Sequence, residues 1–212
     1  MGKKIIYFVR HGESELNREG IRQGPKGPLS EKGREQALEM ARKFPQHRGK
    51  PQIIYASPYE RTRETAEIIA RELGLKIKYS DLLAERRNPS AVVGKKSDDR
   101  EVRLVMDRID KSFHEDGLRY SDEETFLDLK RRAKRLLKFI AGRSKKRIIM
   151  VSHGFFIKIV VAYMLHGDKL TASEYNKLSF FNPLDNAGLT ICLYVHHWLK
   201  RNEWKVLVWN NK

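Results

Sequence analysis

Short apolar runs alternate with longer amphipathic stretches along this chain of 212 residues. Residues 5–9 (IIYFV) are β-branched or aromatic without exception, which is typical of a strand buried on both faces. Residues 51–58 (PQIIYASP) and 147–151 (RIIMV) predict two further buried strands. Near the end, residues 187–210 alternate in hydrophobicity on either side of a KRN segment and predict two paired strands.

The stretches between these runs predict helices. Ser30 is the expected N-cap of a helix over residues 31–44, which Pro45 ends. A second helix is predicted over residues 59–74, with Gly74 as its C-terminal signal. The side chains on its apolar face are Thr62, Ala66, Ile69, Ala70 and Leu73.

The second half of the chain begins less regularly. Residues 76–85 predict a short strand and a loop, followed by a polar insertion that contains a helix over residues 98–116. Ser121 and Glu124 match a capping box for the next helix. Its apolar stripe is Phe126, Leu129, Ala133, Leu136, Leu137 and Ile140. Residues 155–165 are almost entirely apolar and predict a buried helix.

Alternating buried strands and helices predict an α/β fold. We expect a three-layer αβα sandwich with a mostly parallel central sheet and an antiparallel hairpin at one edge. Residues 1–212 are expected to form a single domain, with residues 86–120 as a cap-like insertion over the active-site crevice. Ligands of such sheets bind at the carboxyl ends of the strands. Because His11, Ser57 and His153 all follow predicted strand ends, three segments are expected to bring polar groups to one crevice.

The composition is that of a folded globular protein, with 40% hydrophobic and 33% charged residues. Lys and Arg number 43 against 27 Asp and Glu, which gives a formal net charge of +16. Such a field favours anionic partners. The simpler explanation is a solvated Lys and Arg surface without a partner, although a phosphorylated substrate would also benefit.

Cys192 is the single cysteine, so no disulfide can form within the chain, which suits a reducing compartment. The first residues, MGKKIIYFVRHG, lack the long apolar segment of a secretory signal, and their apolar run is too short to span a bilayer. We therefore expect a cytoplasmic location and no membrane partner.

Two His-Gly steps follow apolar strands, RHG at 10–12 and SHG at 152–154. Imidazole attacks phosphorus well and can form a covalent intermediate, which makes His11 the candidate nucleophile. It must attack while neutral, and neighbouring guanidinium groups oppose its protonation. Arg10 points away from His11 in an ideal strand, so it reaches the crevice only if the chain leaves the strand early, as Gly12 allows. The alternative for a single histidine is a hydrogen-bonding surface residue at a strand end.

Arg61 falls in the first turn of its predicted helix. There its guanidinium can bind two oxygens of a phosphoryl group beside the positive helix end. His153 is expected to donate a hydrogen bond to the same oxygens, and Asn17 an amide hydrogen. Glu85 is the candidate acid that protonates the leaving alkoxide and later takes a proton from water. The alternative for Glu85 is a solvated loop carboxylate.

Metal and nucleotide cofactors are not expected. The chain has no HExxH, no CxxC and no Asp-rich loop, so histidine pairs are not read as metal ligands. It has neither a P-loop nor a Rossmann glycine pattern.

Four segments resemble, in order, those of the histidine phosphatase superfamily in its phosphoglycerate-mutase-like branch. They are RHGESELN (10–17), SPYERTRETA (57–66), ERRNPS (85–90) and VSHG (151–154). The resemblance spans nearly the whole chain. After the acid, this chain reads RRNPS where the family more commonly has glycine, tryptophan and glycine.

The resemblance implies a role for each matching residue. His11 becomes phosphorylated, Glu85 is the proton donor, and the phosphate pocket is lined by Arg10, Arg61 and His153. The residues implied to contact substrate are Asn17, Gln23, Gly24 and Gly154.

The resemblance implies a phosphoric monoester hydrolase, similar to histidine acid phosphatases, that needs no metal and acts on a small phosphorylated metabolite or a phosphoprotein. Mutases of the family have a longer insertion with a GRHYG-type segment, which this chain lacks. Phosphoglycerate mutase activity is therefore the alternative. A non-catalytic protein that binds phosphate or nucleic acid is a third hypothesis, but no motif that reads RNA or DNA accompanies the charge, so no specific nucleic-acid partner is expected. The basic residues of 86–120 suit a polyanionic or sugar-phosphate substrate, and equally a solvated loop.

Overall fold

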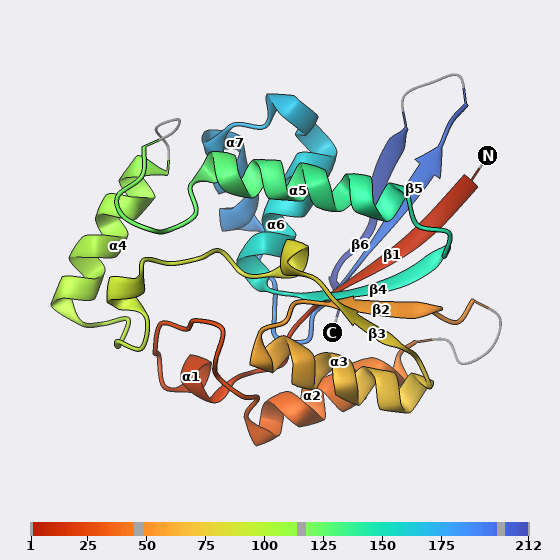
Figure 1. The fold of residues 1–212 in the computed structure, drawn as a ribbon, viewed down its shortest axis with the longest axis horizontal. Helices are drawn as coiled ribbons and strands as arrows, with labels where there is room; N and C mark the ends of the chain where they lie inside the picture. Colours follow the sequence, from red (N-terminus) through yellow and green to blue (C-terminus); the bar gives the residue numbers. More distant parts are fainter. Residues whose placement is uncertain (1, 45–48, 114–117, 199–201, 212) are drawn as a thin grey trace.

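The computed structural model describes residues 2–44, 49–113, 118–198 and 202–211. In these residues the central sheet has six strands in the order β3-β2-β4-β1-β5-β6 (Figure 1). The strands are β1 (Gly2–Arg10), β2 (Ile53–Ala56), β3 (Ile77–Tyr79), β4 (Arg147–Ser152), β5 (Leu189–His196) and β6 (Glu203–Asn211). The first four pair in parallel, whereas β5 is antiparallel to β1 and β6 to β5. The mostly parallel sheet with an edge hairpin is confirmed, while residues 200 and 201 of the KRN segment lie outside the described residues.

Helices cover both faces of the sheet. Figure 1 shows α2 and α3 on one face and α5 and α6 on the other, which gives the three predicted layers. The helices are α1 (Glu15–Arg18), α2 (Glu31–Arg42), α3 (Glu60–Leu73), α4 (Arg100–Ser112), α5 (Phe126–Ala141), α6 (Gly154–His166) and α7 (Ala172–Phe181). Short 3-10 turns cover Asp81–Leu83, Ser90–Val92 and Gly167–Lys169.

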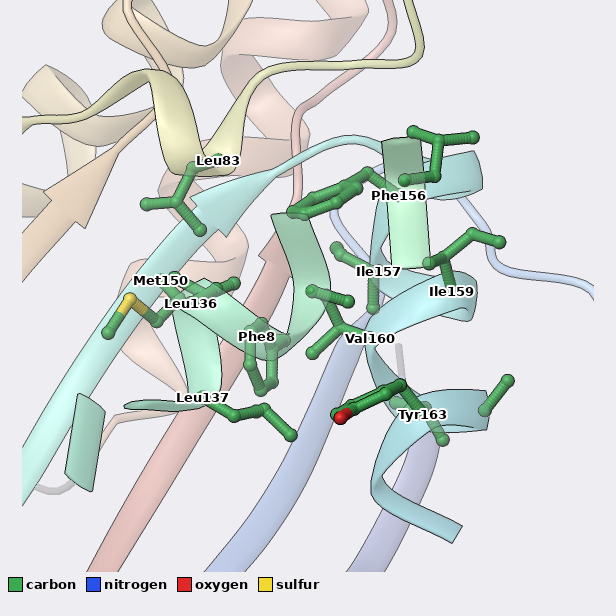
Figure 2. Close-up of a cluster of buried hydrophobic side chains, with 14 of the residues drawn as sticks. Phe8, Leu83, Leu136, Leu137, Met150, Phe156, Ile157, Ile159, Val160 and Tyr163 are labelled. Carbon is green, nitrogen blue, oxygen red and sulfur yellow. The ribbon is translucent and has the colours of Figure 1, made fainter. Parts of the chain in front are cut away.

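Strand β1 lies inside the sheet and is buried on both faces. Phe8 belongs to the core beneath α5 and α6, whereas Tyr7 and Val9 belong to the core beneath α2 and α3. Figure 2 shows part of the first core, including Phe8, Leu83, Leu136, Met150, Phe156 and Val160. Full burial of one such side chain stabilises the fold by about 1.5–3 kcal/mol. The two cores therefore hold β1, and the loop that follows it, in a fixed register.

Two helix boundaries differ from the predicted ones. α2 ends at Arg42, before residue 44, and Lys43 is its C-cap; Pro45 lies outside the described residues. α4 begins at Arg100, after position 98, because the carboxylate of Asp99 accepts the N–H groups at the helix start. It ends at Ser112, and residues 114–116 of the predicted helix lie outside the described residues.

The predicted capping box is wrong. Ser121 and Glu124 lie before α5, and the box is formed by Thr125 and Asp128. Glu124 instead pairs with Arg132, at an N–O distance of 2.7 Å. Two capping signals compete for the same helix, and the one adjacent to the apolar stripe starts it.

The hydrophobic pattern predicts neither α1 nor α7. α1 has only four residues, too few for a helical period, and is capped by Ser14. α7 begins with a capping box of Thr171 and Glu174. That signal is visible in the sequence and could have located the helix.

The described residues between β3 and α5, 80–113 and 118–125, form a lobe beside the sheet. Figure 1 shows α4 standing away from the sheet, on the side of α1. The lobe has a small apolar cluster of its own, made by Val92, Val102, Met106 and Ile109. An antiparallel bridge between Ile21 and Lys96 joins it to the loop after α1.

The start of α2 packs directly on the backbone that follows β1. A Cβ at Gly33 would lie 1.9 Å from the carbonyl oxygen of Glu13, and one at Gly12 would lie 2.3 Å from the carbonyl oxygen of Gly33. The N–H of Ser30 also donates to the carbonyl of Glu13, at 2.9 Å. Because neither glycine has a side chain, α2 can pack closely against the segment that carries His11 and support it.

We expect Gly33→Ala to lower the free energy of unfolding by about 1–3 kcal/mol, because backbone atoms would have to move. Helix propensity alone predicts the opposite, a gain of about 0.5–1 kcal/mol. Gly142→Ala is the control, since a Cβ at that helix end meets nothing closer than 3.7 Å. Urea denaturation measures both changes, and a Gly33→Ala protein as stable as the wild type would contradict the close contact.

Candidate active site

The carboxyl ends of β1, β2 and β4 bring together two imidazoles and a guanidinium. His11 follows β1, His153 follows β4, and Arg61 lies in the first turn of α3, after β2. The ring centroids of His11 and His153 are 5.2 Å apart, and Nε of Arg61 is 3.2 Å from Nε2 of His11. The three side chains are at most 4% exposed. The sequence-based expectation that distant segments converge on one crevice matches this geometry.

The ring of His11 is hydrogen-bonded at both nitrogens. Nδ1 lies 2.6 Å from the carbonyl oxygen of Gly12, which can only accept, so Nδ1 carries the proton. Nε2 accepts a hydrogen bond from Nε of Arg61 and so carries the lone pair. Burial, followed by the charges of Arg61 and Arg10, holds the pKa of His11 well below the usual value for histidine. The result is a neutral imidazole with a nucleophilic nitrogen on the side of Arg61.

Arg61 ties the loop around Gly24 to α3. Its Nη1 donates to the carbonyl oxygen of Gly24 at 2.9 Å. One turn later, the hydroxyl of Thr65 donates to the carbonyl of Arg61 and accepts the N–H of Gly12, at 2.7 and 3.2 Å. The guanidinium and the backbone beside His11 are therefore positioned by the same helix.

His153 is completely buried, and its Nε2 lies 2.9 Å from the hydroxyl oxygen of Ser57. That hydroxyl already accepts the N–H of Tyr59, at 3.3 Å, so its own hydrogen is available for Nε2. This assignment places the ring proton on Nδ1, which is buried and has no hydrogen-bond partner among the described residues. Burial and the nearby Arg61 hold the pKa of His153 well below its usual value. His153 therefore offers a neutral N–H donor.

Arg10 is still part of β1, where it pairs with Ser152, so the expectation that the chain leaves the strand before it is wrong. Gly154 makes room for the guanidinium instead: a Cβ there would lie 3.2 Å from Nε of Arg10. Nη1 donates to the carbonyl of Leu184, while the buried Nε has no partner among the described residues. Its charge helps to depress the pKa of His11, which places the guanidinium beside that ring.

The carboxylate of Glu85 lies next to the first turn of α6, near the cations of the site. Its Oε1 accepts the N–H groups of Arg86 and Phe156, at 2.9 and 3.1 Å. The second of these belongs to the first turn of α6, where the helix dipole favours a negative charge. Its charge counteracts the effect of burial on the pKa of Arg10 and of Arg61, so the carboxylate lies within electrostatic range of both guanidinium groups.

Arg132 holds the backbone of the Glu85 loop. From α5 it donates to the carbonyl oxygens of Ala84 and Glu85, at 2.6 and 3.3 Å. Its guanidinium also pairs with Glu124, at 2.7 Å, and lies 3.8 Å from the ring centroid of Phe156. Both members of the ion pair are largely buried. Arg132 is thus a buried anchor behind the candidate acid.

Asn17 and Gln23, two of the residues expected to contact substrate, lie around Ser14. Its hydroxyl lies 2.9 Å from the side-chain oxygens of both Asn17 and Gln23. One hydroxyl hydrogen can serve only one of these oxygens, so one of the two amides is turned with its NH2 group toward Ser14. Gly24 contacts the site because its carbonyl oxygen accepts a hydrogen bond from Arg61. Among the described residues, no hydrogen bond joins Asn17 or Gln23 to either histidine of the site.

Several positioning residues escape the sequence prediction. The sequence places Ser57 at a strand end but does not show that it pairs with His153. Thr65 lies one helical turn after Arg61, a spacing that places both on one face. Arg132 has no such signal, because it looks like one more cation in the sequence KRRAKR.

In the described part of the chain, no group of three or more His, Cys, Asp or Glu side chains could hold a metal ion. None of the described helices combines the length and apolarity needed to cross a membrane.

Comparison with known proteins supports the same interpretation. Residues 6–212 match the model of the histidine phosphatase superfamily, branch 1. A stretch of 81 residues is 42% identical to an Escherichia coli protein named "Probable phosphoglycerate mutase" and covers 38% of this chain and 37% of that protein. The chain thus matches little more than a third of that relative's length.

Solved structures share the fold over its full extent. A protein named Mycobacterial hydrolase 2 has a TM-score of 0.80 at 22% identity, covering 99% of this chain and 91% of its own. A mycobacterial glucosyl-3-phosphoglycerate phosphatase, solved with VO3, gives 0.74 at 23% identity, with 99% and 100% covered. A mutant phosphoserine phosphatase of Entamoeba histolytica, in complex with phosphoserine, gives 0.73 at 27% identity, with 99% and 97% covered.

We expect the free energy of unfolding to fall as the pH drops below about 6.5. Below that pH the histidines of the unfolded chain bind protons, whereas native His11 and His153 stay neutral because their pKa values are depressed. Each depressed histidine contributes a slope of up to about 1.4 kcal/mol per pH unit, and neither contributes above that pH. The free energy of unfolding, measured by urea denaturation at several pH values between 5 and 7.5, should therefore depend less steeply on pH for His11→Asn. His196→Asn, at an exposed position beside the neutral side chain of Asn202, is the control; an unchanged pH dependence in His11→Asn would refute the depressed pKa.

Proposed function

The chain belongs to the histidine phosphatase superfamily, branch 1, and from this premise we propose that it is a phosphoric monoester hydrolase that works through a phosphohistidine on His11. The observation that carries the proposal is the neutral His11, with its lone pair on Nε2 directed at a buried guanidinium. A nucleophilic nitrogen thus lies beside a cation of the kind that binds phosphoryl oxygens.

The phosphoryl group is bound by donors that the protein leaves available. Nε of Arg10 and Nδ1 of His153 are buried without partners in the described residues. Buried donors without acceptors are unfavourable, so oxygens of a phosphoryl group complement them. A phosphoryl oxygen also takes over the hydrogen bond from Nε of Arg61, which frees the lone pair of His11 for in-line attack.

In the first step, Nε2 of His11 forms a bond to phosphorus while the bond from phosphorus to the ester oxygen breaks. The Glu85 carboxylate takes the proton of the phosphoester monoanion and gives it to the leaving alkoxide. In the second step, the Glu85 carboxylate takes a proton from water, whose oxygen attacks phosphorus and breaks the P–N bond. Guanidinium and imidazole groups supply all the charge stabilisation in this scheme, so it requires no metal.

The substrate is a small phosphorylated metabolite or a phosphoprotein. The Entamoeba histolytica phosphatase, 27% identical, was solved with phosphoserine, and the same protein with 3-phosphoglyceric acid. We propose that the chain is a single domain in which residues 86–120 cover the crevice. Contacts from this segment to the loop after α1 and to Asp128 of α5 support that arrangement.

His11→Ala should lower the release of phosphate from p-nitrophenyl phosphate in EDTA by about a thousandfold or more, because it removes the nucleophile. Quenching with alkali of a reaction with an ester labelled in its phosphate should trap a base-stable, acid-labile phosphoenzyme in the wild type only. His166→Ala is the control and should retain both signals. Full activity of His11→Ala would refute the mechanism.

The second candidate function is phosphoglycerate mutase, favoured by the stretch that is 42% identical to an Escherichia coli relative of that name. The two functions differ in what removes the phosphoryl group from His11: water in a phosphatase, a second phosphoglycerate in a mutase. Incubation with 3-phosphoglycerate distinguishes them by free phosphate or 2-phosphoglycerate as the main product, and we expect free phosphate.

Arg132→Met should lower kcat about 10- to 100-fold, because it releases the backbone behind Glu85. If Arg132 positions the proton donor, the loss is larger for an alkyl phosphate than for p-nitrophenyl phosphate, whose leaving group needs little protonation. Arg131→Met, at an exposed neighbour, is the control. Equal losses for the two substrates would show that Arg132 has only a structural role.

A further inference from the structure

Lysines lie at the amino ends of the parallel strands. Lys3 lies at the start of β1, Lys76 directly precedes β3, and Lys145 and Lys146 directly precede β4. All four side chains are exposed, and we call these four residues the basic end. Figure 1 shows the start of β1 and the loop between α5 and β4 on one side of the molecule, away from α1 and α4.

Hydrogen bonds hold these strand starts side by side. The carbonyl of Lys146 accepts an N–H of β1 at 2.7 Å, and that of Lys76 accepts an N–H of β2 at 3.0 Å. Nε of Arg147 donates to the carbonyl of Lys50, just before β2, at 2.7 Å. Since adjacent strands lie about 4.8 Å apart, the row from β3 to β1 is roughly 15 Å wide. Its cations are therefore close enough to act together on one anionic surface.

Carboxylates do not neutralise the basic end. Residues 1–9, 49–56, 74–80 and 142–151 contain no Asp or Glu. Among the ion pairs of the described residues, none involves a lysine of the basic end. Cations in the last turn of a helix stabilise the helix dipole, but these four lysines lie outside the helices. Their charge therefore remains available to an external anion.

Lys4 differs from these four lysines because the fold uses its charge. Its Nζ donates to the carbonyls of Ile140, Ala141 and Arg143, at the end of α5. Lysine can in this way satisfy the free carbonyls of a helix C-terminus. Within the described residues, the side chains of the basic end donate no comparable hydrogen bond, so the fold does not account for them.

An exposed tryptophan lies at the same end of the sheet. β5 is antiparallel to β1, and its last residue, His196, pairs with Gly2. Trp198 follows two residues later, beyond the start of β1, and is 83% exposed. Its ring centroid lies 5.9 Å from that of His196. Indole rings are enriched at the interface between a bilayer and water, where an apolar body and a polar N–H are both accommodated.

The basic end and the active site lie at opposite ends of the sheet. Lys146 precedes β4 and His153 follows it, so the six residues of this strand separate them by about 20 Å. A partner bound at the basic end would therefore leave the crevice open to substrate.

We propose that the basic end and Trp198 bind the surface of an acidic lipid bilayer. Each lysine near such a surface contributes about fivefold in affinity. A polybasic cluster and an apolar group in the interface are two signals that reinforce each other in peripheral binding. Duplex nucleic acid would also attract the lysines, but its phosphates offer no apolar region to Trp198. The proposal revises the expectation of no membrane partner, which considered only segments that enter or span a bilayer, and it does not depend on the proposed phosphatase function.

Sedimentation with vesicles tests the proposal. The full chain should bind vesicles of phosphatidylcholine with about 30% phosphatidylserine, because the acidic lipid supplies the negative surface potential. It should not bind vesicles of phosphatidylcholine alone, and salt at about 0.5 M should release it by screening. Equal binding to both kinds of vesicle would overturn the proposal.

The double variant Lys145→Gln/Lys146→Gln should bind acidic vesicles about 10- to 30-fold more weakly. Arg103→Gln/Lys111→Gln is the control, because it removes the same charge from exposed positions of α4 and should change the affinity less than about twofold. Equal losses in the two double variants would show that the net charge alone attracts the chain, and would overturn the assignment to the basic end.

Trp198→Ala should weaken binding to acidic vesicles about three- to tenfold without changing its salt dependence, because it removes an uncharged group. Leu104→Ala, at an exposed position of α4, is the control and should bind like the wild type. An unchanged affinity of Trp198→Ala would overturn the role of the indole.

Fluorescence anisotropy with single-stranded and duplex oligonucleotides tests the other class of polyanion. Tight binding to an oligonucleotide that Lys145→Gln/Lys146→Gln weakens, without binding to acidic vesicles, would show that the basic end serves nucleic acid instead. Hydrolysis of p-nitrophenyl phosphate should be the same in all four variants and the wild type, which verifies that the variants fold. A wild type that binds acidic vesicles but hydrolyses no ester would overturn the proposed function and leave the membrane contact intact.

Discussion

The double hydrogen bond at the ring of His11 is the constraint on which the site depends. The Gly12 carbonyl fixes the proton on Nδ1, and Nε of Arg61 faces the lone pair on Nε2. Both partners must keep their places for this tautomer to persist in a buried site. Gly12 is held by the contact with Gly33 and by the hydroxyl of Thr65, and Arg61 by its position at the start of α3. The neutral imidazole with its lone pair on Nε2, which the proposed attack on phosphorus requires, thus ties β1 to α2 and α3.

Buried guanidinium groups are unfavourable, and the fold compensates for them in two ways. The cores on either side of β1 supply apolar burial right up to the site. The carboxylate of Glu85 lies within electrostatic range of Arg10 and Arg61 and offsets part of their charge. In the proposed reaction, the anionic phosphoester neutralises the remaining positive charge. Binding and the relief of this electrostatic strain are therefore the same event, which explains how a site can keep donors without partners.

The sequence predicts that the strand-end residues come together, because buried parallel strands have a strong pattern and their carboxyl ends meet at one edge. It cannot predict contacts that depend on packing between distant segments. Gly33 looks like a weak helix residue until α2 is seen against the loop of Glu13. The route of Arg10 depends on the absence of a side chain at Gly154, far along the chain. The sequence does not distinguish Arg132 from its basic neighbours; only its contacts with the Glu85 loop and Phe156 in the folded chain do. The lobe is hardest to predict, since its single helix packs on only a small apolar cluster.

The proposed proton donor depends on its neighbours in the chain and in space. Glu85 and Arg86 share one loop, whose backbone Arg132 anchors to α5 and whose side chains contact α4 and α6. The backbone N–H of Arg86 holds the carboxylate of Glu85, so a movement of this loop would also turn the proposed proton donor. Leaving-group departure can therefore be altered from α5, through Arg132, without any change at His11.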